Sequence, residues 1–249
     1  MSRVPDGLRF TAEHEWIADA GDGMHPPAAE MYELIQILQD LRDFDRLEDL
    51  FREERKTNPA LDDWFNAWFC SDYTIEDLKD CAPGTVGGIY YQAATQGSYD
   101  VQIVPNFKPQ TQWQYYSLRA GQTHDYEHIL TGGGFNYIGE LLPYWFRLAT
   151  IDQHIQNKEL AGEMNVMGIL GTTRYLLRTV LHYPETWGAA LKCIEQGIAI
   201  GRNSDPFWMA KMEDYWHTPL DEARRILGVR GAADLDTEAE GQIWSGLKV

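Results

Sequence analysis

The chain has 249 residues, of which 44% are hydrophobic, with 9 Trp and 13 Tyr; this composition supports a sizeable core and excludes a disordered protein. The formal net charge of −17 excludes nucleic acid as a partner, because phosphate binding requires a basic surface. It also excludes attachment to anionic lipid by charge alone and leaves attachment through apolar side chains open.

The number of cysteines and the N-terminal sequence indicate in which cellular compartment the protein is expected. The three cysteines, Cys70, Cys81 and Cys193, are odd in number and widely spaced, which is typical of reduced thiols rather than of a disulfide framework or a zinc-binding pair. The N-terminus lacks the basic and apolar segments of a secretory leader, and no apolar run approaches the ~20 residues that span a bilayer. We therefore expect a cytoplasmic protein without a membrane-spanning helix.

The N-terminal part of the chain is expected to form an arm followed by helices. Residues 1–27 show no lasting periodicity, which predicts a loosely held arm. After residue 27, apolar residues recur at helical spacing, with turn residues between the periodic stretches. The expected elements are helices over 28–51, 60–69, 74–82 and 85–96, and one short strand-like stretch, YDVQIVP, over 99–105.

The C-terminal part is expected to be helical up to an acidic tail. No repeat, low-complexity tract or linker divides the chain. We therefore expect a single all-α, multi-helix domain over 28–230, with a weakly structured acidic tail over 231–249. The expected helices of this part lie near 109–131, 136–150, 159–181, 185–200 and 206–227.

The stretch HDYEHILTGGGFNYIGE, from His124 to Glu140, concentrates groups that bind metals. Residues advance about 100° around an α-helix, so His124 and His128 are nearly stacked and Asp125 lies on the adjacent flank. The three glycines that follow end the helix and permit a reversal. Asn136 is placed to cap the next helix, and Glu140 lies one turn into it, facing back toward the histidines.

Two interpretations of this stretch stay open. Two imidazoles and a carboxylate suit zinc, iron, manganese or cobalt, and Asp125 is then either a ligand or the partner that orients a histidine. Alternatively, the HxxxH spacing arises by chance on a solvated helix, and Tyr126 and Glu127 lie at its surface. The first interpretation predicts one divalent metal ion, with open positions typical of a catalytic non-haem centre.

The same residues carry a resemblance to a known family. HDYEH followed by eleven residues and Glu140 resembles the HDxxH-x11-E signature of the coenzyme Q (ubiquinone) biosynthesis proteins of the Coq-four type. Four further stretches are similar to family elements, so the resemblance covers roughly residues 28–230. They are APGTVGGIYY with Pro83, Gly84, Thr85, Gly87 and Tyr90, GILGTTRYLL with Arg174, GIAIGRN with Gly201 and Arg202, and MEDYWHTPLDEARRILGV with Glu213, Trp216, Leu220 and Arg224.

The resemblance implies a fold, a site and a function. It implies an all-helical protein with a pocket for a long isoprenoid chain, peripheral contact with the inner membrane, a homodimer, and other quinone biosynthesis proteins as partners. It implies action on a polyprenylated hydroxybenzoate-type precursor, whose carboxylate at ring carbon 1 is replaced by hydroxyl in an oxidative decarboxylation. The metal and catalytic residues that it implies are His124, Asp125, His128 and Glu140.

Three arginines are candidates for substrate binding. Arg174 and Arg178 are one turn apart on an expected helix, and an arginine fork suits a carboxylate or a phosphate. Arg174 and Arg202 also lie in stretches that carry the resemblance. For Arg178, a surface ion pair with nearby acids is an equal alternative.

Pro143 departs from the pattern. It lies three residues after Glu140, inside the helix that is expected to hold this carboxylate. A proline there leaves the Gly139 carbonyl unpaired and bends the helix, which is expected to re-aim Glu140. The arm and the tail match no part of the family.

Two other functions fit the same residues. The second hypothesis is a non-catalytic, isoprenoid-binding scaffold of a quinone biosynthesis complex, in which the metal is structural. The third is a metal-dependent phosphohydrolase of the HD kind. Those enzymes separate their first histidine from an adjacent His-Asp pair, whereas here both histidines lie within two turns, so this hypothesis ranks third.

Overall fold

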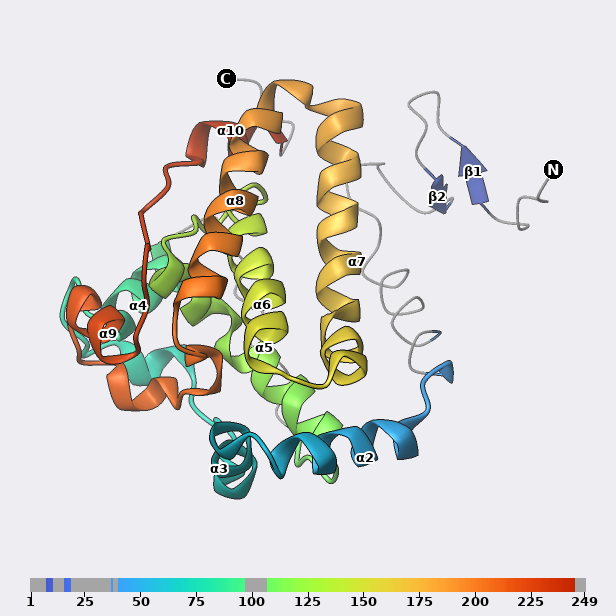
Figure 1. The fold of residues 1–249 in the computed structure, drawn as a ribbon. Helices are drawn as coiled ribbons and strands as arrows, with labels where there is room; N and C mark the ends of the chain where they lie inside the picture. The colour runs from blue at the N-terminus through green and yellow to red at the C-terminus, as the bar shows by residue number, and fades with distance from the viewer. Residues whose placement is uncertain (1–7, 11–15, 19–36, 38–39, 97–106, 245–249) are drawn as a thin grey trace.

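The computed structural model describes residues 8–10, 16–18, 37, 40–96 and 107–244 (Figure 1). Its helices are α2 (Phe44–Arg55), α3 (Pro59–Ala67), α4 (Val86–Gln96), α5 (Gln112–Thr131), α6 (Leu141–His154), α7 (Lys158–His182), α8 (Trp187–Asn203), α9 (Leu220–Ile226) and α10 (Glu238–Trp244). Short 3-10 helices are η1 (Ile75–Leu78), η2 (Pro184–Thr186), η3 (Phe207–Met209) and η4 (Met212–Tyr215). The strands β1 (Leu8–Phe10) and β2 (Trp16–Ala18) pair antiparallel.

The all-α prediction is confirmed for the body of the protein. The strand-like stretch 99–105 and most of the expected helix before residue 41 lie outside the described residues. The boundaries at 27 and 230 between arm, domain and tail stay a prediction.

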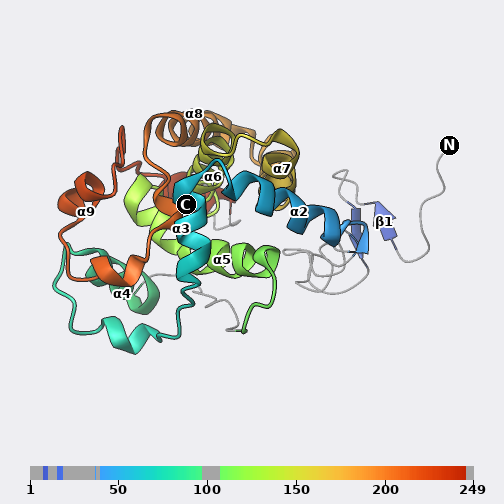
Figure 2. The ribbon, with the colours of Figure 1, turned by 60° about the horizontal axis from the view of Figure 1, so that its bottom comes forward.

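Helix α6 lies at the centre of the bundle, between α7 and α8, and α5 crosses beneath it (Figure 1, Figure 2). Two glycines let α8 approach α6 at backbone distance. A Cβ atom on Gly197 would lie 2.5 Å from the Leu142 carbonyl oxygen, and one on Gly201 2.5 Å from that of Phe146. Helices α4 and α9 close the side of the bundle away from α7.

An aromatic cluster fills the core where α3, α5 and η3 meet. The Trp64 ring lies 4.6 Å from the Tyr115 ring and 5.2 Å from the Trp208 ring, centroid to centroid. Phe146 of α6 stacks on Phe207 at 4.4 Å. All five rings are buried, and burying a side chain such as Phe stabilises the fold by roughly 1.5–3 kcal/mol.

The single helix expected near 206–227 is wrong, because this segment forms η3, η4 and the short α9 instead. Pro219 has no N–H to donate, and a residue before proline, here Thr218, is pushed toward extended backbone. The extended segment at Thr218 forms a hydrogen bond with the start of α4, because the Val86 N–H donates to the Thr218 carbonyl at 3.0 Å. It thus satisfies a backbone donor at the start of another helix.

The described part of the acidic tail is hydrogen-bonded to the body of the protein. The Leu235 N–H donates to the Gly132 carbonyl at 3.0 Å, and the Thr237 side chain is buried. Helix α10 follows over Glu238–Trp244. The described residues 231–244 thus contact the loop after α5 and carry one short helix, and the weak structure expected for residues 231–249 stays a prediction.

Helix α7 lies at the edge of the bundle (Figure 1) and has 25 residues. The Asn157 side chain caps it by accepting from the N–H groups of Glu159 and Leu160. Among the described residues, no helix combines the length and the apolar character needed to cross a membrane. Several apolar side chains of α7 are nevertheless exposed: Ile169, Leu177, Val180 and Leu181.

Candidate metal centre

Helix α5 carries the two histidines in its last turns. The ring centroids of His124 and His128 are 5.0 Å apart. The helix ends at Thr131 because Gly132 adopts the left-handed conformation, with φ of 86°, and its N–H donates to the His128 carbonyl. The expected reversal at the glycines is confirmed.

The reversal places Glu140 directly before α6 rather than inside it. Residues 135–140 form a turn in which the Asn136 side chain accepts from the Gly139 N–H at 2.9 Å. The Asn136 carbonyl accepts from the Glu140 N–H at 2.9 Å. Because α6 begins at Leu141, the helix start expected near residue 136 is wrong, although Asn136 caps a turn.

Pro143 consequently does not disturb Glu140. It lies in the first turn of α6, where a missing N–H leaves no hydrogen bond unmade. The Gly139 carbonyl accepts from the Leu142 N–H at 3.1 Å. The expected unpaired carbonyl and re-aimed carboxylate are therefore wrong.

His124, His128 and Glu140 converge on one point. Each offers one ligand atom, and these three atoms lie within 4.8 Å of one another. Nε2 of His124 is 3.0 Å from Glu140 Oε2, and Nε2 of His128 is 3.4 Å from Glu140 Oε1. His128 and Glu140 are buried while His124 is partly exposed, so the site has one side open to solvent.

The ring of His128 is held in one orientation. Its Nδ1 lies 3.1 Å from the Gly134 carbonyl oxygen, which can only accept, so Nδ1 carries the hydrogen. Nε2 on the other side of the ring then faces Glu140 Oε1 at 3.4 Å. Phe135 stacks on the ring at 4.9 Å. A metal-binding imidazole is typically oriented by such a hydrogen bond, and two imidazoles with a carboxylate fit a divalent metal.

The charges of these three side chains stabilise one another. Burial alone would lower the pKa of His124, but the Glu140 carboxylate raises it to about 9. Burial opposes ionisation of Glu140, yet the two imidazoles hold its pKa well below the usual range. The metal-free site therefore pairs a carboxylate with a proton at His124, where a cation would compete for the same place.

Asp125 lies outside this group of three. Its Oδ2 accepts from the Tyr90 hydroxyl at 2.7 Å. Tyr90 packs edge-on against Tyr126, whose hydroxyl donates to Tyr73 and accepts from Trp216. Asp125 is thus held by a buried aromatic network. Its role as a ligand stays a prediction.

The solvated-helix interpretation is wrong, because Tyr126 and Glu127 are buried. Glu127 accepts from the Arg147 Nε at 2.7 Å, and Arg147 also donates to the Thr123 hydroxyl at 2.9 Å. This ion pair links α5 to α6. Nothing in the sequence marks this pair beyond an acidic residue beside His128, because the two partners are 20 positions apart.

Of the three arginines, Arg174 is the one whose charge acts on Tyr144, the tyrosine beside His124. Its guanidinium is 5.2 Å from the centre of the Tyr175 ring. Burial raises the pKa of Tyr144, and the charge of Arg174 opposes that rise. Arg178 lies over Tyr183 at the end of α7, and Arg202 is exposed in the last turn of α8. Substrate binding by the three arginines stays a prediction.

Two tyrosines, Tyr144 and Tyr175, lie in a row between His124 and Arg174. Tyr144 lies 5.2 Å from the His124 ring and 6.2 Å from the Tyr175 ring. Gly171 on α7 makes room for it, since a Cβ atom there would lie 3.3 Å from the Tyr144 ring. Sequence reasoning missed Tyr144 and Tyr175, because aromatic residues are abundant and nothing local marks these two.

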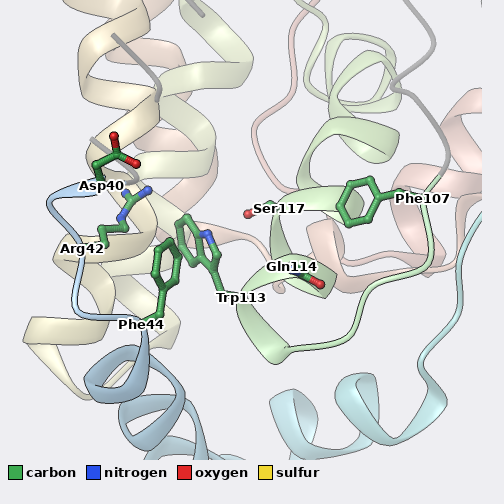
Figure 3. A pocket seen from close by; sticks show the side chains of 7 residues that line it. All are labelled: Asp40, Arg42, Phe44, Phe107, Trp113, Gln114 and Ser117. Carbon is green, nitrogen blue, oxygen red and sulfur yellow. The ribbon is translucent and has the colours of Figure 1, made fainter. Parts of the chain in front are cut away.

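A surface hollow of about 480 Å³ lies at the opposite end of α5 (Figure 3). One wall is the Trp113 ring, over which the Arg42 guanidinium lies at 4.3 Å. The histidines lie in the last turns of α5, so the hollow is separate from them. Its lining residues are Asp40, Arg42, Phe44, Phe107, Trp113, Gln114 and Ser117.

Comparison with known proteins agrees with this architecture. A crystal structure from Nostoc punctiforme PCC 73102, provisionally named a ubiquinone biosynthesis protein, aligns with a TM-score of 0.54 at 21% identity, over 74% of this chain and 82% of that chain. Such a likeness supports the fold alone. No curated protein matches this chain. The model of the family "Coenzyme Q (ubiquinone) biosynthesis protein Coq4" matches residues 69–232, more than half of the chain, and the protein therefore belongs to this family.

Proposed function

We propose that this protein is a metal-dependent enzyme of ubiquinone biosynthesis that oxidatively decarboxylates a polyprenylated hydroxybenzoate-type precursor at ring carbon 1. The observation that carries the proposal is the convergence of His124, His128 and Glu140 beside aromatic side chains and an arginine. A divalent metal held by these three side chains would supply Lewis acidity or redox capacity at the substrate's oxygens.

Each side chain has a distinct task in this proposal. Glu140 supplies a carboxylate, because the imidazoles keep its pKa well below the usual range. His128 is fixed by the Gly134 carbonyl and presents Nε2 to the site. His124 is the partly exposed member, so substrate approaches from its side. Asp125, held by Tyr90 next to His124, supports the orientation of this turn of α5.

Arg174 is proposed to bind the ring carboxylate. A planar guanidinium matches the two oxygens of a carboxylate. The rings of Tyr144 and Tyr175 lie between Arg174 and His124, where a substrate ring would find aromatic faces and edges to pack against. Ring carbon 1 is bonded directly to this carboxylate, so the carboxylate would lie between the Arg174 guanidinium and the histidines, with the ring against the tyrosines.

The reaction balances with dioxygen and a two-electron donor. The aryl carboxylic acid, dioxygen and two hydrogen equivalents yield the phenol, carbon dioxide and water. The bond between ring carbon 1 and the carboxyl carbon breaks, and a bond from that ring carbon to oxygen forms. The residues of this chain bind the substrate, orient it and partly exclude water; they supply no electrons.

The isoprenoid tail requires contact with a membrane. The exposed apolar side chains of α7 are proposed to make this peripheral contact, and they include Ile169, Leu177 and Leu181. Burial of each methylene gives roughly 0.8 kcal/mol, so a few such side chains and a tail suffice for binding. Dimerisation and contact with other quinone biosynthesis proteins belong to the same proposal.

The test uses a prenylated 4-hydroxybenzoate labelled with ¹³C in its carboxyl group. Metal-loaded protein with dioxygen and a reductant is expected to release labelled carbon dioxide and to form the phenol, both measured by mass spectrometry. His128→Ala is expected to abolish both products while the lipid still binds. His217→Ala, an exposed histidine after η4, is the matched control.

The outcome separates the three functions. Lipid binding without turnover in the wild type would contradict the proposal and favour the scaffold. Release of phosphate from prenyl phosphates or nucleotides would favour the phosphohydrolase. Equal product from wild type and His128→Ala would show that the converging side chains do not carry the chemistry.

A further inference from the structure

The C-terminal segment 233–241, here called the clasp, lies against the turn that carries the metal-binding side chains. Asp234 accepts from Arg224 at 2.7 Å, and Arg224 in turn donates to the last carbonyls of α5, at Ile129 and Leu130. The Leu235 N–H donates to the Gly132 carbonyl. The clasp is thus fastened to the end of α5.

Thr237 is the buried centre of the clasp. Its hydroxyl lies 3.0 Å from Nδ2 and 3.1 Å from Oδ1 of Asn136. Asn136 accepts from the Glu140 N–H through its carbonyl and from the Gly139 N–H through its side chain. The hydroxyl of Thr237 therefore fixes the residue that sets the position of Glu140.

The same hydroxyl also contacts the residue that orients His128. A Cβ atom on Gly134 would lie 2.9 Å from Thr237 Oγ1, so Thr237 packs directly on the Gly134 backbone. The Gly134 carbonyl accepts from His128 Nδ1. Gly241 of α10 completes the contact, because a Cβ atom there would lie 2.7 Å from the Asn136 side chain.

We propose that the clasp sets the metal affinity of the site, with Thr237 as the positioning residue for both Glu140 and His128. The inference rests on the proposed metal binding by these side chains. The family model ends at residue 232, so the clasp is a feature of this chain outside the matched region. Partners that orient metal ligands in this indirect way typically change metal affinity 10- to 100-fold when they are removed.

The test titrates the full-length, metal-free protein with Co²⁺ alone and follows the visible absorption of the bound ion. Thr237→Val keeps the shape of the side chain and removes its hydroxyl, and it is expected to weaken Co²⁺ binding by about 10-fold or more and to alter the spectrum. Thr237→Ser restores the hydroxyl and is expected to restore both. Gly241→Ala, which pushes α10 from Asn136, is expected to act in the same direction.

Two controls separate positioning from general stability. Glu238→Gln changes an exposed residue of α10 and is expected to bind Co²⁺ as the wild type does. The melting temperature of each metal-free variant reports the fold. Wild-type affinity and spectrum in both Thr237→Val and Gly241→Ala would overturn the role of the clasp. Failure of the wild type itself to bind Co²⁺ would overturn the metal centre and the clasp together.

Discussion

The Nδ1–H of His128 donates to the carbonyl oxygen of Gly134 at 3.1 Å, so a backbone group of the following loop orients the imidazole. This carbonyl lies directly against the backbone of Gly139, where any Cβ atom would overlap it. The bond therefore depends on a glycine five positions further on.

Gly139→Ala is expected to push the Gly134 carbonyl away from His128. We expect metal affinity to fall by about 10-fold or more, because the imidazole loses its orienting partner. A competition titration against a chromophoric chelator measures this. Gly162→Ala is the matched control, since a Cβ atom there meets nothing within 4 Å and alanine favours the helix by up to about 1 kcal/mol. Unchanged affinity in Gly139→Ala would contradict the account of His128.

Metal affinity is expected to rise with pH up to about 9. Glu140 raises the pKa of His124 to about 9, so below that pH a proton must leave His124 before its Nε2 binds a cation. The apparent affinity should increase roughly tenfold per pH unit in this range, if no other group titrates, and level off above it. Glu140→Gln removes the charge that raises this pKa and is expected to lower the pKa of His124 in the metal-free protein. Proton release, measured by calorimetry in two buffers, checks the same point.

The sequence predicted the parts of this site that depend on local spacing. His124 and His128 share a helix face through helical periodicity, and three glycines marked the reversal. The start of α6 was not predictable, because the turn at Asn136 is stabilised by Thr237, about 100 residues away. The position of Asp125 depends on Tyr90 in another helix for the same reason.

Removal of Arg147 is expected to destabilise the protein strongly. Burial raises the pKa of Glu127, and Arg147 opposes this rise. Arg147→Met would leave Glu127 buried without its ion-pair partner, which typically costs about 3–5 kcal/mol. Urea denaturation of the metal-free protein measures the loss. The double variant Arg147→Met with Glu127→Gln should recover part of it.

Arg225→Met is the control for this experiment. It breaks an exposed ion pair with Glu222 on α9, and the stability should stay close to that of the wild type. Equal stability of Arg147→Met and the wild type would show that the buried pair contributes little.

The exposed apolar face of α7 is expected to bind neutral lipid. Leu177→Gln and Leu181→Gln together should weaken flotation with phosphatidylcholine vesicles, because apolar burial, not charge, drives the contact. Ile226→Gln removes an exposed apolar side chain on α9 and should leave flotation unchanged. If the α7 variant instead loses a dimer in sedimentation while still floating, the face binds a second copy of the chain.

Metal content tests the central claim most directly. We would measure metal by plasma mass spectrometry in protein purified without an affinity tag or added metal, as wild type, His128→Ala, Glu140→Ala and the surface control His217→Ala. The account predicts about one divalent ion per chain in the wild type and the control, and its loss in the other two. Equal metal in all four proteins, or none in the wild type even after titration, would contradict it.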